Sequence, residues 1–152
     1  MLIRIEASEL PGRDCGQAPG FPGYRNIQVG VQRRDRRDEI LGLHPGDASA
    51  AVWELEVTAT AKEAGWDLLG PYVQGRPGAR FVYLSWGALG DDGVLSMFRR
   101  AKLHFDAIPP NVLEHAVHSG MLVARLSLTD SRGQPLCAAV RPPLIDWSAP
   151  AP

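Results

Sequence analysis

The chain has 152 residues, of which 45% are hydrophobic and 22% are charged, and its formal net charge at pH 7 is −1. This length predicts one domain, residues 1–152, which can bury roughly 68–70% of its unfolded surface and needs no disulfide to form a core. Because the charge is close to zero, the composition argues against nucleic acid and anionic membranes as partners. The composition is compatible with a small molecule or a protein as the partner.

The sequence gives no sign of a targeting or membrane-spanning segment. Residues Leu2 to Glu6 alternate apolar and charged side chains, unlike the apolar core of a secretory signal. No stretch approaches the ~18 apolar residues of a membrane span. The sequence therefore predicts a cytoplasmic protein in which Cys15 and Cys137 are reduced thiols.

Seven segments have the composition or the period-two alternation of β-strands. They are residues 2–7, 26–32, 53–60, 81–86, 94–105, 121–129 and 136–141. Residues 81–86 are apolar on both faces, which predicts a central strand covered on two sides. Residues 94–105 suit either period, and the Gly90–Gly93 turn before them favours a hairpin strand over a helix.

The segments between these strands are predicted to be irregular. Residues 10–24 are crowded with glycine and proline, which indicates a long loop. Residues 33–39 interleave four arginines with three acids, so they suit a solvated connection better than a phosphate-binding patch. The tail, residues 142–152, contains four prolines and should be extended, with Trp147 able to fold back onto the body.

One helix is expected, from Pro110 to Ser119. It has a proline in its first turn, apolar residues on one side and Gly120 as its terminating residue. Since strands and helices do not alternate along the chain, the sheet should be mainly antiparallel. The predicted fold is mainly β, an antiparallel β-sandwich or small barrel of about seven strands with this one short helix.

Two carboxylates are candidates for chemistry. Glu54 and Glu56 are two positions apart in a predicted strand, which puts them on one face roughly 6–7 Å from each other. Paired carboxylates suit general acid–base work or a hard metal ion. They equally suit a solvent-facing row that is balanced by Arg100 and Lys102 from a neighbouring strand.

Three histidines are candidate metal ligands. His115 and His118 are three residues apart on the predicted helix, and His104 could supply a third nitrogen. The cysteine and glutamate spacings of zinc sites are missing from the sequence. Attraction of cationic side chains to a helix C-terminus accounts for the helical pair, so no metal and no cofactor are expected.

The stretch from Gly70 to Leu103 concentrates arginine, glycine and aromatic residues. Its candidate ligand-binding residues are Tyr72, Gln74, Arg76, Trp86, Arg99, Arg100 and Lys102. Arginine forks beside aromatic rings can bind an anionic or planar ligand or anchor a protein interface. In the alternative, the rings fill the core and the arginines pair with Glu54, Glu56 and Asp67.

Several motifs resemble those of a known family. They are GPYVQGRPGARFVYLSWG, MFRRAKL, LTDSRGQPLCAAVRPP, VGVQRR and WELEVT. In these motifs the chain is similar to a family of short, single-domain bacterial proteins, frequent in actinobacteria and known only as a domain of unknown function. The resemblance covers nearly the whole chain and implies no role for any residue. The longer insert from Thr60 to Gly65 is expected to change only a loop.

Three functions follow as hypotheses. The first is a binding module that recognises a small polar or anionic ligand, or a protein partner, through the arginine and aromatic residues. The second is a small cofactor-independent enzyme with Glu54 or Glu56 as general base and Arg99 or Arg100 as anion stabiliser. The third is an interaction protein that forms a homodimer through an exposed sheet edge. Because consecutive strand residues alternate, the two arginines should occupy opposite faces.

Overall fold

The structure is a computed structural model, and it describes residues 1–8, 26–34, 38–45, 50–76, 79–89, 95–127 and 144–151. Its strands are β1 (Leu2–Ser8), β2 (Asn26–Gln32), β3 (Asp38–Pro45), β4 (Ala50–Glu56), β5 (Thr58–Lys62), β6 (Gly65–Leu69), β7 (Gln74–Arg76), β8 (Ala79–Leu89), β9 (Leu95–His104), β10 (Met121–Ser127) and β11 (Leu144–Ser148). Its helices are the 3-10 helix η1 (Phe105–Ala107) and the α-helix α2 (Pro110–Ser119).

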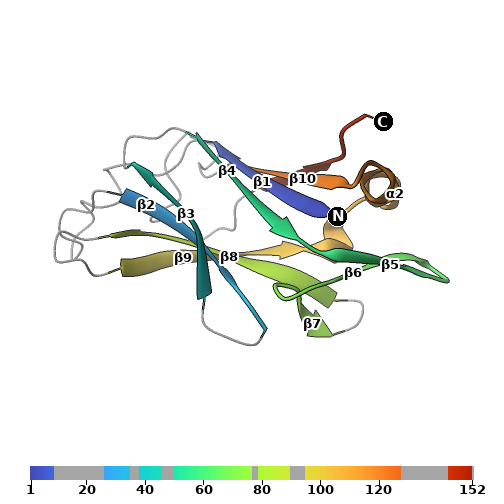
Figure 1. The fold of residues 1–152 in the computed structure, drawn as a ribbon, viewed down its shortest axis with the longest axis horizontal. Coiled ribbons are helices and arrows are strands. Elements are labelled where there is room, and N and C mark those ends of the chain that lie inside the picture. The colour runs from blue at the N-terminus through green and yellow to red at the C-terminus, as the bar shows by residue number, and fades with distance from the viewer. Residues whose placement is uncertain are drawn as a thin grey trace.

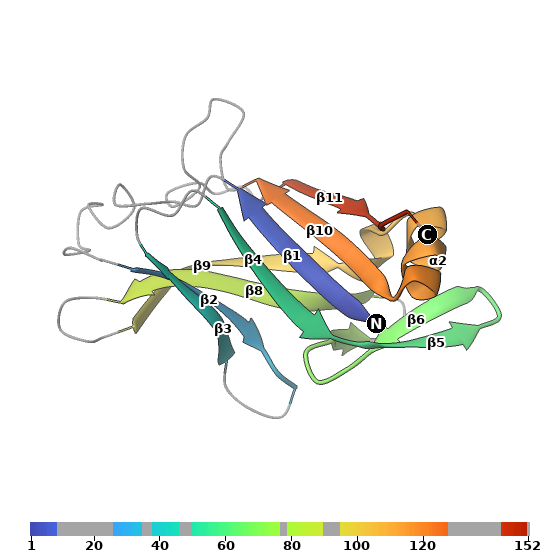
Figure 2. The ribbon, with the colours of Figure 1, turned by 45° about the horizontal axis from the view of Figure 1, so that its top comes forward.

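Two sheets face each other and form a sandwich (Figure 1). The β1 sheet has the order β11-β10-β1-β4, and Figure 2 shows its strands side by side. The β8 sheet has the order β3-β2-β8-β7, and β9 also pairs with β8. Strands β5 and β6 form a two-stranded hairpin. Neither sheet closes into a barrel over the described strands, so the sandwich is the correct form of the predicted mainly-β fold.

The strand pairs are antiparallel with one exception. Strand β1 pairs parallel with β10 along its whole length, from Leu2 opposite Met121 to Ser8 opposite Ser127. A parallel pair needs a long crossover connection, and here the chain between the two strands passes through the whole β8 sheet. The prediction of a mainly antiparallel sheet is therefore confirmed, but the first strand has a neighbour that local pattern could not indicate.

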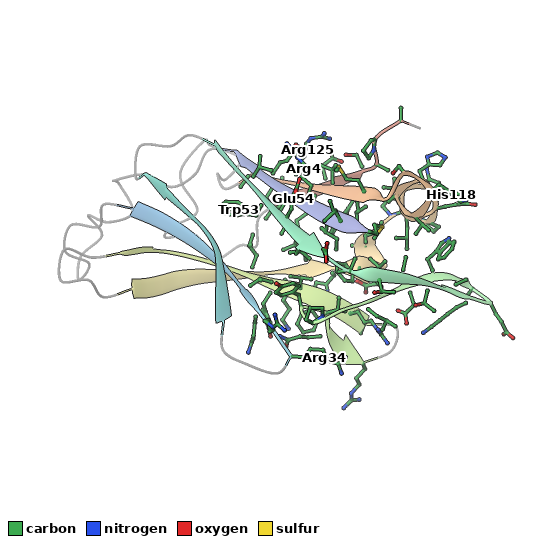
Figure 3. The ribbon with its side chains drawn as sticks, viewed as in Figure 1. Arg4, Arg34, Trp53, Glu54, His118 and Arg125 are labelled. Carbon is green, nitrogen blue, oxygen red and sulfur yellow. The ribbon has the colours of Figure 1, made fainter. Side chains whose placement is uncertain are left out.

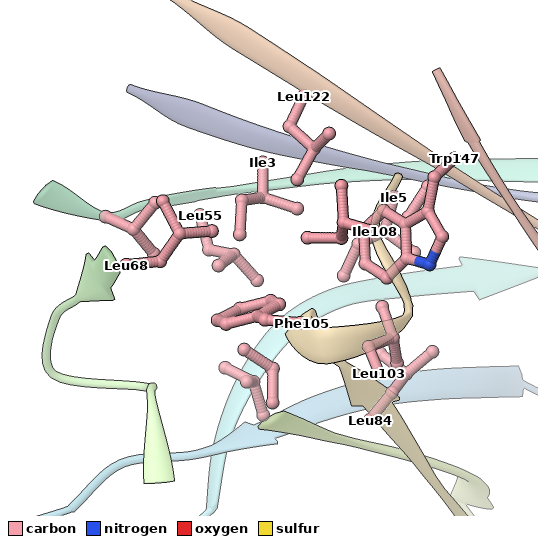
Figure 4. Close-up of a cluster of buried hydrophobic side chains, with 14 of the residues drawn as sticks. Ile3, Ile5, Leu55, Leu68, Leu84, Leu103, Phe105, Ile108, Leu122 and Trp147 are labelled. Atoms are coloured by element: carbon pink, nitrogen blue, oxygen red, sulfur yellow. The ribbon is translucent and has the colours of Figure 1, made fainter. Parts of the chain in front are cut away.

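The core lies between the two sheets (Figure 4). Ile3 and Ile5 of β1 are 1% and 0% exposed, and they face Leu84 and Leu103 of the β8 sheet. The intervening Arg4 stays outside, as period two predicts. Each fully buried aliphatic side chain of this kind contributes about 1.5–3 kcal/mol through the hydrophobic effect.

Helix α2 lies at one end of the sandwich, and β11 is the edge strand of the β1 sheet beside β10 (Figure 2). The helix has the predicted bounds, and Gly120 ends it with φ of 76°. Strand β11 forms within the segment predicted as an extended tail and pairs with β10. Trp147 is 8% exposed there and packs against Phe105, with ring centroids 6.4 Å apart. The tail is thus extended and also part of a sheet.

Several predicted boundaries are wrong. Residues 53–60 form two strands. Met1 and Val57 end the β1–β4 ladder with backbone hydrogen bonds of 2.9 and 3.0 Å, and the chain from Thr58 pairs with β6 instead. Residues 38–45, predicted as connection and loop, form β3 beside β2. The insert from Thr60 to Gly65 belongs to the β5–β6 hairpin. The expected loop 10–24, the 90–93 turn, the 136–141 strand and both cysteines lie outside the described residues.

Two glycines with positive φ allow a test of local strain. Gly120 has open space where a Cβ would stand, whereas a Cβ on Gly75 would collide with the backbone oxygen of Ala79. We expect Gly120→Ala to lower the free energy of unfolding by about 1 kcal/mol, from left-handed strain alone. Gly75→Ala should cost more, because the backbone must also move. Urea unfolding measures both, and equal losses would contradict the steric argument.

Candidate functional site

One part of the outer surface of the β8 sheet gathers aromatic and cationic side chains. In the ladder, Gln74 pairs with Phe81, Phe81 with His104, and Tyr83 with Lys102. Directly paired residues of antiparallel strands project from the same face, so these five side chains share one face. Val82 and Leu84 of β8 and Leu103 of β9, which alternate with them, are at most 1% exposed and belong to the core. The shared face is therefore the outer one.

Lys102 lies over two aromatic rings of the neighbouring strand. Its Nζ is 4.7 Å from the centroid of the Phe81 ring and 5.4 Å from that of the Tyr83 ring. The two rings pack edge to face, with centroids 4.9 Å apart and an interplanar angle of 78°. An exposed ammonium over an aromatic face gains about 0.5–1 kcal/mol. The rings thus favour a position of Lys102 close to the sheet.

The end of β2 is fastened to β7 and to the segment before it. The backbone N–H of Arg34 donates a 2.7 Å hydrogen bond to the backbone oxygen of Pro71. The Gln74 side chain donates from Nε2 to the backbone oxygen of Gln32, at 3.1 Å. The guanidinium of Arg33 lies 5.7 Å from the centroid of the Tyr72 ring. These contacts bring two further arginines to the β7 end of the sheet.

We define the cationic face as Arg34, Arg76 and Lys102 together with the rings of Phe81 and Tyr83. Arg76 pairs in the ladder with the first residue of β8, so it shares the face of Phe81, and all three cations are exposed. Among the described residues, no carboxylate forms an ion pair with any of the three. Their charges are therefore solvated and open to an anionic group.

Other predicted residues of the β8 sheet are described by their backbone register. Trp86 pairs with Arg99, and Arg100 pairs with Ser85, two ladder positions from Lys102. The side chains of Trp86, Arg99 and Arg100 lie outside the described part of the structure, so their roles stay predictions. Asp38 of β3 pairs with Gln32, the last residue of β2.

The two candidate glutamates lie on the outer face of the other sheet. Glu54 pairs with Arg4 in the β1–β4 ladder, and its Oε1 is 3.5 Å from Arg4 Nη1. Glu6 accepts 3.0 Å hydrogen bonds from both Arg4 and Arg125. Figure 3 shows Arg4, Glu54 and Arg125 together on this sheet, and Arg34 on the opposite side of the molecule. The predicted balance of Glu54 by a cation of β9 is wrong, because its partner is Arg4.

The two outer faces are separated by the core of the sandwich. Glu54 and Glu56 are exposed on β4, while Gln74 and Lys102 belong to the outer face of the β8 sheet. The structure therefore does not bring the candidate bases together with the described cations of the candidate binding set. It does bring Gln74, Arg76 and Lys102 onto one surface, with Tyr72 in the adjoining segment.

Arg80 has a structural role instead. Its Nη1 donates a 3.1 Å hydrogen bond to the backbone oxygen of Leu68, and its Nη2 is 3.3 Å from Asp67 Oδ2, which also contacts Lys62 Nζ. These contacts fasten the β5–β6 hairpin to β8. A cleft of about 140 Å³ lies beside them, lined by Trp66, Asp67, Leu68, Arg80, Phe105, Asp106 and Leu113. The sequence hypothesis that arginines pair with Asp67 thus holds for Arg80.

The histidines occupy two different places. His115 and His118 are exposed on α2, where His118 Nδ1 lies 2.8 Å from the backbone oxygen of Glu114. His104 lies next to Phe81, with ring centroids 5.6 Å apart, and 3.8 Å from a carboxylate oxygen of Asp106. No group of three or more His, Cys, Asp or Glu residues in the described chain is arranged to hold a metal ion.

Three members of the cationic face, Phe81, Tyr83 and Arg34, are not among the predicted binding residues. Residues 81–86 were expected to be covered on both faces, but Phe81 and Tyr83 are half-exposed on the outer face. The spacing of two between these aromatic residues was the available signal. Arg34 stood in a run whose interleaved acids suggested mutual neutralisation. Its backbone contact with the segment before β7 is long-range and could not be read from that run.

These features define a two-layer β-sandwich with one α-helix and an exposed cationic and aromatic surface. The chain belongs to the family of unknown function DUF5990, whose sequence model matches residues 1–150. This confirms the resemblance to an uncharacterised domain family. Neither the curated proteins nor the solved structures contain a match to the chain. Within the described residues, no helix is both long and apolar enough to cross a membrane.

The ion pairs of Glu54 and Asp67 should contribute differently to the free energy of unfolding. The Glu54 side chain is 45% exposed, whereas that of Asp67 is 14% exposed between two cations. We expect Glu54→Gln to change the free energy of unfolding by less than about 0.5 kcal/mol. Asp67→Asn should cost about 1–3 kcal/mol, because it leaves partly buried charge without its partner. Urea unfolding of both variants tests this order, and a larger loss for Glu54→Gln would contradict it.

The position of Lys102 can be measured directly, since the sequence contains two lysines, Lys62 and Lys102. Reductive ¹³C-methylation keeps both charges and labels each ammonium. The methyl signal of Lys102 should lie upfield of that of Lys62, because ring currents of Phe81 and Tyr83 shield it. Arginine substitution of each lysine assigns the signals, and Phe81→Leu should reduce the difference. Identical shifts for the two lysines would show that Lys102 does not lie over the rings.

Proposed function

We propose that the protein is a binding module that recognises an anionic group through its cationic face. One observation carries the proposal: the Lys102 ammonium lies over Phe81 and Tyr83 and has no ion-pair partner in the described part of the chain. A free lysine side chain must lose rotamer freedom when it binds. The two rings already restrict Lys102, so an anion that contacts it meets a partly ordered charge.

The distribution of charge over the molecule supports the proposal. The whole chain has a net charge of −1, but its described acids are used unevenly. Glu6 and Glu54 pair with arginines on the β1 sheet, and Asp67 pairs at the β5–β6 hairpin. Among the described residues, Arg34, Arg76 and Lys102 have no such partners. These three described cations therefore offer positive charge to an anion.

The side-chain chemistry of the face also suits an anion. Exposed guanidinium groups present planar forks of N–H donors that match carboxylate and phosphate oxygens. Arg76 is held on the face by the three-residue strand β7, and Gln74 in the same strand is fixed by its hydrogen bond to the end of β2. The N–H donors of Gln74 and Arg76 therefore belong to a strand that is paired with β8, which holds them more rigidly than a loop would.

Calorimetric titration with inorganic pyrophosphate and with citrate tests the proposal at low ionic strength. Both probes should bind, and Lys102→Met should weaken binding about three- to fivefold, as expected for one exposed ion pair. The matched control is Lys62→Met, on the β5–β6 hairpin, which should bind like the wild type. Binding should also weaken in high salt. Equal affinity of the Lys102 and Lys62 variants would refute this placement of the anion.

A further inference from the structure

We propose that the cleft where β6 meets β8, η1 and α2 is a second binding site, and that it takes a small organic ammonium ion with an apolar body. This site is separate from the cationic face and goes beyond the proposed function. Three properties of the cleft select this class of ligand: its apolar walls, the pairing of its charged residues, and its volume.

The walls of the cleft are mainly apolar. Trp66 and Leu68 come from β6, Phe105 from η1 and Leu113 from α2. Trp66 and Leu113 are half-buried, so part of their surface is open to a ligand. Ligand sites have this composition, in which mostly apolar residues surround a few polar groups that orient the ligand. Aromatic rings also attract organic cations. The walls therefore suit an organic molecule better than a hydrated inorganic ion.

Two of the three charged residues in the described lining are already paired with each other. Arg80 Nη2 is 3.3 Å from Asp67 Oδ2, and Arg80 Nη1 donates a 3.1 Å hydrogen bond to the backbone oxygen of Leu68. The Arg80 and Asp67 side chains are 18% and 14% exposed. Lys62, which does not line the cleft, contacts the same oxygen of Asp67. The guanidinium and the carboxylate of this pair are therefore committed to contacts within the protein.

Asp106 is the charged lining residue that is left. Its carboxylate is 57% exposed, and its ion-pair partner among the described residues is His104, with Nδ1 3.8 Å from Oδ1. That imidazole is charged only when it is protonated. The described lining thus has one more carboxylate than it has cations. A ligand ammonium can pair with Asp106 while the apolar body of the ligand contacts the walls.

The volume of the cleft limits the size of the ligand. Its 140 Å³ is close to the volume of an engineered apolar cavity, about 150 Å³, that holds benzene. A single ring with a short amine arm therefore suits the cleft, whereas a nucleotide is too large. A divalent metal ion suits it poorly, because such an ion needs several oxygen ligands and Asp67 is already engaged by two cations.

NMR titration with three matched probes tests the inference. Benzylammonium, benzyl alcohol and benzoate share one ring and differ in charge, and the backbone amide shifts of the labelled protein report where each binds. Benzylammonium should shift the signals of β6, η1 and α2, and it should bind about threefold more tightly than benzyl alcohol. Tighter binding of benzoate at these elements would overturn the charge argument. Equal affinity of benzylammonium and benzyl alcohol would overturn it as well.

Variants of the lining separate the carboxylate from the walls. Asp106→Asn should weaken benzylammonium binding about three- to fivefold and leave benzyl alcohol binding unchanged, since only the ion pair is lost. Leu113→Trp should abolish the binding of both probes, because the larger side chain fills the cleft. The matched control is Asp146→Asn at an exposed position of β11, which should bind like the wild type. Thermal unfolding verifies the fold of each variant. Unchanged benzylammonium binding by Asp106→Asn would overturn the role of this carboxylate.

The two sites can be tested separately. Lys102→Met should leave benzylammonium binding unchanged, and Leu113→Trp should leave pyrophosphate binding unchanged. Loss of benzylammonium binding in Lys102→Met would place this probe on the cationic face and overturn the inference. If millimolar benzylammonium does not bind to the wild-type protein, the inference is wrong, while pyrophosphate binding through Lys102 still supports the proposed function.

Discussion

Strand β8 is the element on which the arrangement of both faces depends, because it pairs with β2, β7 and β9. Its alternation sends Val82 and Leu84 into the core, and it sends Phe81 and Tyr83 to the outside. The register with β9 then sets Lys102 directly opposite Tyr83. A shift of one residue would exchange the two faces and bury the ammonium in the core. The hydrophobic demand of the core therefore fixes the position of the cationic face.

The outer faces of the two sheets differ in how their charged side chains are paired. On the β1 sheet, acids and arginines face each other across neighbouring strands, as Arg4 does with Glu54 and Arg125 with Glu6. Pairs this exposed add little stability, but they leave that surface without a strong field. On the described part of the β8 sheet around Lys102, the outward positions hold aromatic, amide and cationic groups. The same near-neutral composition thus yields one balanced surface and one with unpaired cations.

Sequence patterns predicted the parts of the fold that short-range rules control. Period-two alternation predicted β1 and β2, an apolar run predicted β10, and a proline with a terminating glycine predicted the bounds of α2. The patterns missed β3 and β11, whose prolines and charges suit loops but whose backbones are paired by neighbouring strands. They also missed the parallel pairing of β1. In each case the deciding contact joins residues that are distant in the chain, so no local window contains it.

The candidate site was predictable to a similar degree. Gln74, Arg76 and Lys102 were chosen for their residue types, and the ladder unites them on one face. The partner of Glu54 was assigned to the wrong sheet, because strand order cannot be read from the alternation within a strand. Phe81 was overlooked because an apolar residue in an apolar strand suggests core. The pairing of β8 with β9 was needed to show that it supports Lys102.

The parallel pair of β1 and β10 also constrains how the chain reaches this fold. Glu6 of β1 and Arg125 of β10, which form an ion pair, are 119 residues apart in sequence. Closing so large a loop costs chain entropy before any contact repays it, and folds rich in such distant contacts form slowly. During synthesis from the N-terminus, Ile3 and Ile5 must wait with one side unpaired until β10 emerges. Strand β1 is thus completed only after β10 has formed.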